Sequence, residues 1–425
     1  MLNQFVQTTP LKNGVTVVTD FMENANSVTI GAWIPRGSRH ETIETNGLSH
    51  FYEHLVFKGT ETRSTLELVC ALEDVGGFLD AYTTRQETGF YALVNQENAF
   101  LALEIVADLL MNSVFTEEDI EKERKVILEE IKNYDDIAEE RVGDLFNEIH
   151  FNGSALAFPV AGTLKSVKAL RKEALLTYKN QVTEDLPIYI CAAGNIDHHA
   201  LLQKVEVFFQ KKEKGTLVLP ISYQAGRSYK TIVKNELSQS SLYLGTSTPN
   251  HLLPSDFRYS FSIFNVLMGS GMSSRLFQKI REDYGLAYSV YSVADLYQDA
   301  FSWGVSLATK PSRLEKAVLL VQKEIQNFLK NGISNSDLNR IKQNILGGVK
   351  INLDSTEKRC LRLAEQQLHI GRYASIDELE AGVNEVSQSK LLSLMQMFFE
   401  ENQWSAAVIQ PSIAKKLSIL KEFEV

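Results

Sequence analysis

Short apolar runs rich in β-branched residues alternate with longer helical patterns along the chain. Runs of four to eight such residues between turn residues are typical of strands. Arg85 and Gln86 separate two of these runs, which predicts a hairpin or two adjacent strands. Helical patterns prevail from there to about residue 180. The predicted strands of the first half are 14–19, 27–34, 79–84, 89–95 and 188–194.

The second half of the chain opens like the first. Residues 242–249 parallel residues 29–35, and if Pro249 is equivalent to Pro35 the offset is 214 (249 − 35). With this offset, Phe264 and Met268 correspond to His50 and His54 of the first half. The second half would then be a duplicate in which apolar residues replace these histidines. The charged run 211–215 ends in glycine and is the predicted linker. The predicted domains are therefore 1–214 and 215–425.

One short motif carries most of the chemical information. Residues 50–54 read His-Phe-Tyr-Glu-His, so His50 and His54 lie about one helical turn apart and can bind one metal ion. Glu53, beside His54, can reach a water on that ion. A solvated helix face with no metal is the alternative, but the surrounding residues predict a buried helix, in which imidazoles and a carboxylate need partners. These apolar neighbours are Leu48, Phe51, Leu55, Val56 and Phe57.

A catalytic zinc site usually has three protein ligands and an open position for water. Glu130 is the candidate third ligand, on a predicted helix that Thr116 and Asp119 open as a capping box. Glu123 lies seven residues earlier and shares a helix face with Glu130. Ile120, Ile127 and Tyr134 belong to the same face. Two carboxylates in an apolar stripe are costly unless a metal ion and its histidines satisfy them.

With these residues, the chain resembles the pitrilysin/insulinase family of inverzincin metallopeptidases. Within that family it is similar to the branch of short chains that resemble the mitochondrial processing peptidase. A bacterial source is expected. The family pattern maps onto His50, Glu53, His54, Glu123 and Glu130. Further segments that resemble the family are 76–88, 192–198, 271–277 and 285–290.

The resemblance implies a mechanism and a fold. It implies one Zn²⁺ per subunit on the two histidines and Glu130, with Glu53 as general base and Glu123 in support. Arg281 and Tyr288, seven apart, would bind substrate and stabilise the oxyanion. The implied fold is α+β, with two similar domains, each a mainly antiparallel sheet covered by helices, together forming half of a clamshell. Because both signatures occur in one chain, a homodimer with composite active sites is expected.

The segment around residues 79–84 resembles the strand along which the family binds substrate. An extended peptide would add a strand there, held by backbone hydrogen bonds. Asp80, Ala81 and Tyr82 are the expected substrate-binding residues. The family often has asparagine where this chain has Asp80, so the contact expected at that position is altered.

Composition narrows the class of protein. A chain of 425 residues is too long for a single ordinary hydrophobic core, so two or more domains are expected. Its content of 44% apolar and 23% charged residues is typical of a globular protein. A net charge of −10 argues against nucleic-acid binding, and no apolar run is long enough to predict a membrane span. The first residues show no signal-peptide pattern. Three distant cysteines fit a reduced compartment, so a cytoplasmic protein without disulfides is expected.

Two other functions are open at this point. One is a non-catalytic or partner-dependent subunit of a processing-peptidase-like complex. The other is a metal hydrolase that acts on something other than peptides. The intact metal and base residues favour an active enzyme over the first, and the substrate-strand segment favours peptides over the second.

Overall fold

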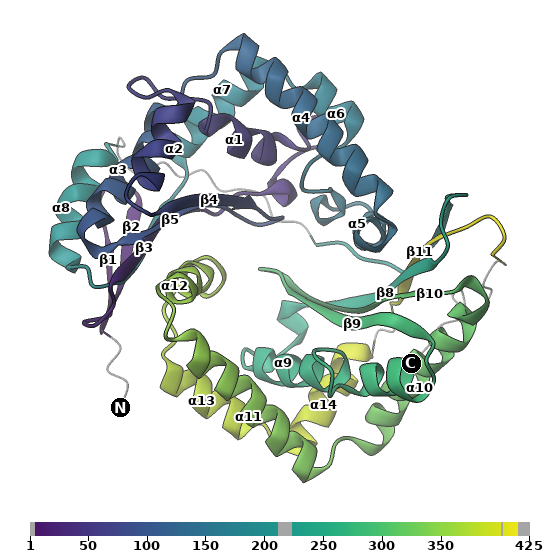
Figure 1. Cartoon of the computed structure of the whole chain (residues 1–425). Coiled ribbons are helices and arrows are strands. Elements are labelled where there is room, and N and C mark those ends of the chain that lie inside the picture. The colour runs from purple at the N-terminus through teal and green to yellow at the C-terminus, as the bar shows by residue number, and fades with distance from the viewer. Residues whose placement is uncertain (1–4, 211–222, 401–402, 415–425) are drawn as a thin grey trace. The chain divides into compact units, whose positions relative to one another are not determined.

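A computed structural model of the chain describes residues 5–210, 223–400 and 403–414 (Figure 1). The chain divides into two compact units, which are treated separately below. Strands predicted from the sequence are present in both. No helix among the described residues is long and apolar enough to cross a membrane.

The first unit is built on a six-stranded sheet in the order β1-β2-β6-β3-β5-β4. All neighbouring strands are antiparallel except β2 and β6, which run parallel. The strands are β1 (Phe5–Pro10), β2 (Val15–Phe21), β3 (Ser27–Ile34), β4 (Phe78–Thr83), β5 (Thr88–Asn95) and β6 (Ile188–Gly194). Among the strands of the described residues β4 pairs with β5 alone, so it is an edge strand of this sheet.

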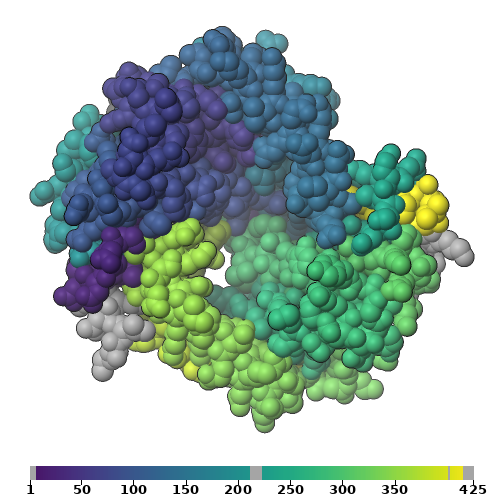
Figure 2. Space-filling view, viewed as in Figure 1, coloured from purple at the N-terminus to yellow at the C-terminus, as the bar shows by residue number. Residues whose placement is uncertain are grey.

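Helices cover both faces of the first sheet. Side chains of β3 alternate between two cores: Val28, Ile30 and Ala32 point into one and Trp33 into the other. On the larger core, α3 packs on β3 and β5, and α1 and α2 pack on β4 (Figure 1). The helices of this unit are α1 (Leu48–Val56), α2 (Thr65–Glu73), α3 (Ala99–Asn112), α4 (Glu117–Asp136), α6 (Leu164–Ala169), α7 (Lys172–Asn180), α8 (His198–Phe208) and α12 (Thr356–Ile370). In the space-filling view, the purple and blue atoms of the N-terminal part of the chain form one continuous surface (Figure 2).

The second unit repeats this plan. Its five-stranded sheet has the order β7-β11-β8-β10-β9, and again a single pair, here β7 and β11, runs parallel. Taken in order, these strands match β2-β6-β3-β5-β4 in both position and direction. The strands are β7 (Tyr229–Val233), β8 (Ser240–Pro249), β9 (Ala287–Leu296), β10 (Ala300–Thr309) and β11 (Ser405–Gln410). The helices are α5 (Ala138–His150), α9 (Phe257–Met268), α10 (Leu314–Asn331), α11 (Asn335–Asn352), α13 (Ile376–Glu385) and α14 (Gln388–Phe399).

The predicted duplication is therefore confirmed at the level of topology. Phe264 and Met268, predicted to replace the two histidines, lie on α9 and are fully buried in the core of the second unit. These two positions belong to the apolar core of that unit. The chain thus has two similar α+β units.

One helix in each unit comes from the other half of the sequence. Helix α12 packs on β6, β3 and β2 of the first sheet, whereas α5 packs on β8 and β11 of the second. Each covers the sheet face that the unit's other helices leave open: Cys360 and Leu363 contribute to one small core, Val142 and Phe146 to the other. The linker and boundary predicted around residue 214 fall outside the described residues, so that boundary stays a prediction.

Candidate metal centre

The start of α1 is held by a buried carboxylate. Glu41 accepts hydrogen bonds from the backbone N–H groups of Gly47, at 2.8 Å, and Ser49, at 2.7 Å, and from Nδ2 of Asn46 at 3.0 Å. Burial raises the pKa of Glu41, opposed by these hydrogen bonds. Gly47 itself has a left-handed backbone with φ of 93°, which glycine adopts without strain. This cap fixes where α1 begins and so where its side chains point.

Three potential ligands meet between α1 and α4. His50 and His54 come from α1 and Glu130 from α4, and one ligand atom of each lies within 4.8 Å of the others. Nε2 of His50 is 3.8 Å from Oε1 of Glu130, and Nε2 of His54 is 3.6 Å from Oε2. With zinc–ligand bonds of about 2.0–2.2 Å, a tetrahedral site needs ligand separations of roughly 3.3–3.6 Å. The two measured separations are close to that range.

The second carboxylate of α4 orients one of these histidines. Glu123 is buried, and its Oε2 lies 3.1 Å from Nδ1 of His54. Its Oε1 is 2.7 Å from Nζ of Lys58, which balances the buried charge. Hydrogen bonding at Nδ1 leaves Nε2 of His54 directed at Glu130, the arrangement by which proteins orient metal-binding histidines.

The residues present fit a zinc ion. Burial, followed by the effect of His54, lowers the pKa of His50 to about 3, so its imidazole is neutral, the form that binds metals. Nδ1 of His50 is buried and makes no hydrogen bond to any described residue. Two imidazole nitrogens and one carboxylate form a donor set found in catalytic zinc sites.

Glu53 lies beside this cluster but is not part of it. Its Oε2 accepts a hydrogen bond of 2.5 Å from the Thr83 hydroxyl, at the end of β4. Burial raises the pKa of Glu53, and the hydrogen bond from Thr83 acts in the opposite direction. The side chain is therefore held by the strand and not by the ligand histidines.

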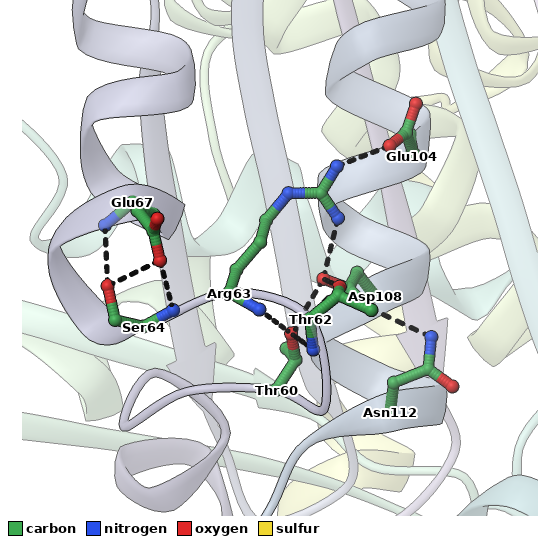
Figure 3. A network of polar contacts seen from close by, with 8 residues as sticks. All are labelled: Thr60, Thr62, Arg63, Ser64, Glu67, Glu104, Asp108 and Asn112. Carbon is green, nitrogen blue, oxygen red and sulfur yellow. Dashed lines mark hydrogen bonds and ion pairs between the residues drawn. The ribbon is translucent and has the colours of Figure 1, made fainter.

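The segment that follows α1 is anchored on α3 (Figure 3). Asp108 accepts hydrogen bonds from Nη1 of Arg63, the Thr60 hydroxyl and Nδ2 of Asn112, each at 2.8 Å. The other terminal nitrogen of Arg63 pairs with Glu104. Both ends of α1 are therefore attached to neighbouring structure, which limits how far its histidines can move.

Helix α4 follows the predicted pattern except towards its end, where Glu130 is exposed. Thr116 and Asp119 form the predicted capping contacts, with the backbone N–H of Asp119 donating to the Thr116 hydroxyl at 3.1 Å. Ile120 and Ile127, on either side of Glu123 in the sequence, are buried. Tyr134, predicted on the same face, is 38% exposed. The buried stripe of this helix ends at Ile131.

The predicted substrate-binding residues lie in two places. Asp80, Ala81 and Tyr82 are on β4, in the unit that holds the histidines and Glu130. Arg281 and Tyr288 lie in the second unit and contact each other: Nη1 of Arg281 donates to the Tyr288 carbonyl at 3.1 Å. The guanidinium also sits 4.7 Å from the centroid of the Tyr288 ring, which is itself 79% exposed. The structure thus brings this pair together, with Tyr288 on β9 and Arg281 on the short π-helix (Phe277–Asp283) before it.

Three residues of the site were not expected from the sequence. Lys58 lies four residues after His54, in the turn that follows α1, so its spacing from His54 was available as a signal. Thr83 lies two residues after Ala81 in β4, so the two side chains are on the same face of the sheet. Glu41 has no local signal, because its role as a cap depends on how the loop before α1 folds.

Comparison with known proteins identifies related sequences along most of the chain. Residues 16–164 match the family described as insulinase (peptidase family M16), and residues 169–345 match the M16 peptidase inactive domain. The uncharacterized zinc protease YmxG of Bacillus subtilis is 32% identical over 401 residues, 94% of this chain and 97% of YmxG. The uncharacterized zinc protease ML0855 of Mycobacterium leprae is 32% identical over 413 residues, 96% and 92% of the two chains.

Solved structures share the fold. A protease from Helicobacter pylori superposes with a TM-score of 0.88 at 18% identity, covering 96% of this chain and all of that one. A putative M16-like peptidase from Alicyclobacillus acidocaldarius gives a TM-score of 0.83 at 19% identity, covering 97% and 99%. At these identities the similarity establishes the architecture of two similar α+β domains.

Proposed function

The chain belongs to the insulinase family of peptidases, family M16, and we propose that it is a zinc-dependent endopeptidase. The observation that carries this proposal is the cluster of His50, His54 and Glu130, with Glu53 next to it but outside it. Three ligands and a separate carboxylate are what metal-assisted hydrolysis requires. Relatives named zinc proteases support the same conclusion.

The proposed roles follow from the positions of the side chains. A zinc ion held by His50, His54 and Glu130 would polarise the scissile carbonyl and lower the pKa of a water. Glu53 takes a proton from the attacking water and passes it to the leaving amine, so water adds across the peptide bond. Glu123 keeps the His54 ring oriented.

The substrate is proposed to be a peptide or an unfolded protein segment. Strand β4 has a free edge and ends at Thr83, whose hydroxyl contacts Glu53. A peptide that adds as a strand along Asp80, Ala81 and Tyr82 would be carried to that carboxylate by backbone hydrogen bonds. Such binding depends little on side chains and suits a broad range of sequences.

Arg281 and Tyr288 are proposed to bind substrate and to stabilise the oxyanion, in a homodimer with composite sites. Tyr288 is exposed and the Arg281 guanidinium lies over its ring, so the pair can contact another molecule. Since one chain carries both the metal residues and this pair, two identical copies suffice. We further propose that the enzyme works in the cytoplasm, where its free cysteines Cys70, Cys191 and Cys360 stay reduced.

Digestion of a peptide library, read by mass spectrometry, tests the proposed activity. Cleavage should stop when a chelator removes the metal and return when zinc is added back. The matched control is Glu53→Gln, which should retain zinc yet lose about 10²–10⁴-fold or more in turnover. Cleavage that survives chelation, or that is equal in the Glu53→Gln protein, would show that this site is not the source of activity. Peptide binding without cleavage would favour a non-catalytic subunit, and hydrolysis confined to other ester or amide substrates would favour a different metal hydrolase.

A further inference from the structure

The free edge of β4 presents backbone groups at alternate residues. The N–H of Thr84 bonds to the carbonyl of Glu87 in the turn to β5. Counting back in steps of two, Tyr82 and Asp80 also face β5, opposite Gly89 and Tyr91. The backbone groups of the intervening residues, among them Ala81, point away from the sheet. These are the groups with which an added strand would pair.

One of these outward groups already has a partner. The N–H of Ala81 donates a hydrogen bond of 2.9 Å to Oδ1 of Asp80, the preceding side chain. A second contact fixes the carboxylate, because the Tyr91 hydroxyl lies 3.0 Å from Oδ2. That hydroxyl also lies 3.3 Å from Oε1 of Glu357 on α12. Asp80 is exposed, yet both of its oxygens are engaged.

We propose that Asp80 determines specificity by capping the edge of β4, so that an incoming peptide must displace its carboxylate from the Ala81 N–H. The inference rests on the proposed function, since it concerns how a peptide strand reaches the same site. In the free protein, Oδ1 occupies the place that a substrate carbonyl needs. Only a segment that can offer several backbone hydrogen bonds at once replaces this cap at little cost. The cap thus favours fully extended, unpaired chains over short or folded ones.

Removing the cap should strengthen peptide binding. The net contribution of one intramolecular hydrogen bond typically changes an equilibrium constant about three- to tenfold. In Asp80→Ala the Ala81 N–H is exposed to water, which a peptide carbonyl displaces readily. Asp80→Asn keeps an amide oxygen that can accept the same hydrogen bond without a charge, so its effect should be intermediate.

The experiment measures binding without turnover. In the zinc-loaded Glu53→Gln background, the Kd of a fluorescent, uncharged extended peptide is measured by anisotropy. Asp80→Ala should lower the Kd about three- to tenfold. Glu357→Gln is the matched control: it removes one charge beside the same Tyr91 hydroxyl and leaves the Ala81 N–H capped, so the Kd should not change.

Two further measurements separate the cap from a simple charge effect. Lysine-bearing and glutamate-bearing versions of the peptide should both gain from Asp80→Ala, because the freed group is a backbone N–H, although loss of the Asp80 charge makes the gain larger for the glutamate version. Amide hydrogen exchange in residues 78–83 should be faster in Asp80→Ala than in the parent protein.

Several results would overturn the inference. Binding of the uncharged peptide that is no tighter in Asp80→Ala would do so, as would a gain confined to the glutamate-bearing peptide. Self-association of Asp80→Ala without any change in peptide affinity would show that the cap only protects an open edge from other copies. If the parent protein binds none of the peptides, the proposed function is wrong and this inference with it.

Discussion

The hydroxyl of Thr83 and the carboxylate of Glu53 form a 2.5 Å hydrogen bond that joins the end of an edge strand to the helix of the metal centre. Glu53 is the proposed base, and β4 is the strand proposed to bind the peptide. The bond therefore connects the strand proposed to position the substrate with the carboxylate proposed to transfer the proton.

Loss of this bond should affect turnover more than binding. In Thr83→Val the carboxylate loses the partner that fixes it, and we expect kcat to fall about 10- to 100-fold with KM within about twofold. Thr83→Ser keeps the hydroxyl and should recover most of the rate, with zinc content unchanged in both variants. Equal kcat values for the valine and serine variants would show that the hydroxyl is not needed.

Zinc binding should depend on all three proposed ligands. His50→Ala and Glu130→Gln each leave two ligands, and elemental analysis after dialysis should find less than about a tenth of the parent's zinc. Glu129→Gln is the matched control, because this neighbouring glutamate is exposed and outside the ligand cluster. Full zinc in both ligand variants would place the metal elsewhere.

Glu123 should act through His54 and not as a ligand. Replacing it with glutamine removes the anion from Nδ1 of His54, so zinc affinity should fall about 10- to 100-fold, as is usual for such supporting residues. Competition with a chelator of known affinity measures the change. Zinc should still reach one per chain at saturation. A saturating stoichiometry well below one would instead make Glu123 a ligand.

The site residues that lie close together in the sequence could be predicted, whereas the contacts that depend on tertiary packing could not. His50 and His54 were found because one helical turn brings both imidazoles to the same side, a relationship within five residues. The contact between Thr83 and Glu53 depends instead on how α1 docks against β4, which no local pattern encodes. Likewise, the alternation in β4 places Asp80 on a strand but does not indicate that its side chain bonds to the N–H of the next residue.

The fold shows the same division. The equivalence of Pro35 and Pro249 predicted a second half like the first, and the matching strand orders confirm it. Nothing in the sequence of α12 indicates which sheet it covers. That choice depends on contacts across the chain, such as the ion pair of Arg359 with Asp20 on β2. Local periodicity predicts an amphipathic helix but not its partner.

Acid should destabilise the second unit through His150. Its two ring nitrogens lie 3.0 Å from the Ser405 hydroxyl and 2.7 Å from that of Ser247, and burial lowers its pKa from 6.5 to about 4. Above pH 6.5 the ring is neutral in both the folded and the unfolded chain, so this stability is fully present. As the pH falls from 6.5 towards 4, the unfolded chain gains a proton that the folded chain does not, and stability is lost.

The size of that loss can be measured by substitution. Once the pH has fallen below about 4, the shifted pKa of His150 has lowered the free energy of unfolding by about 3 kcal/mol. In chelated protein, urea unfolding at about pH 7.5 and about pH 5 should show a smaller loss for His150→Gln than for the parent. His251→Gln, at an exposed position, is the control and should follow the parent. A parent-like loss in His150→Gln would assign the acid sensitivity to other groups.

The final prediction concerns the proposed homodimer. If the metal centre of one copy works with Arg281 and Tyr288 of the other, two different inactive chains can restore each other. Glu53→Gln removes the base, and Tyr288→Phe removes the hydroxyl proposed to stabilise the oxyanion, so each variant alone should be nearly inactive. After subunit exchange, a mixed dimer has one site with both lesions and one site with neither. With random exchange, about half of the dimers are mixed and half of their sites are intact, so activity should return to about a quarter of the parent's. The control mixes Glu53→Gln with His50→Ala, which damage the same centre and should not complement. A mixed dimer verified by native mass spectrometry that stays inactive, or an active monomer by light scattering, would show that each chain uses only its own residues.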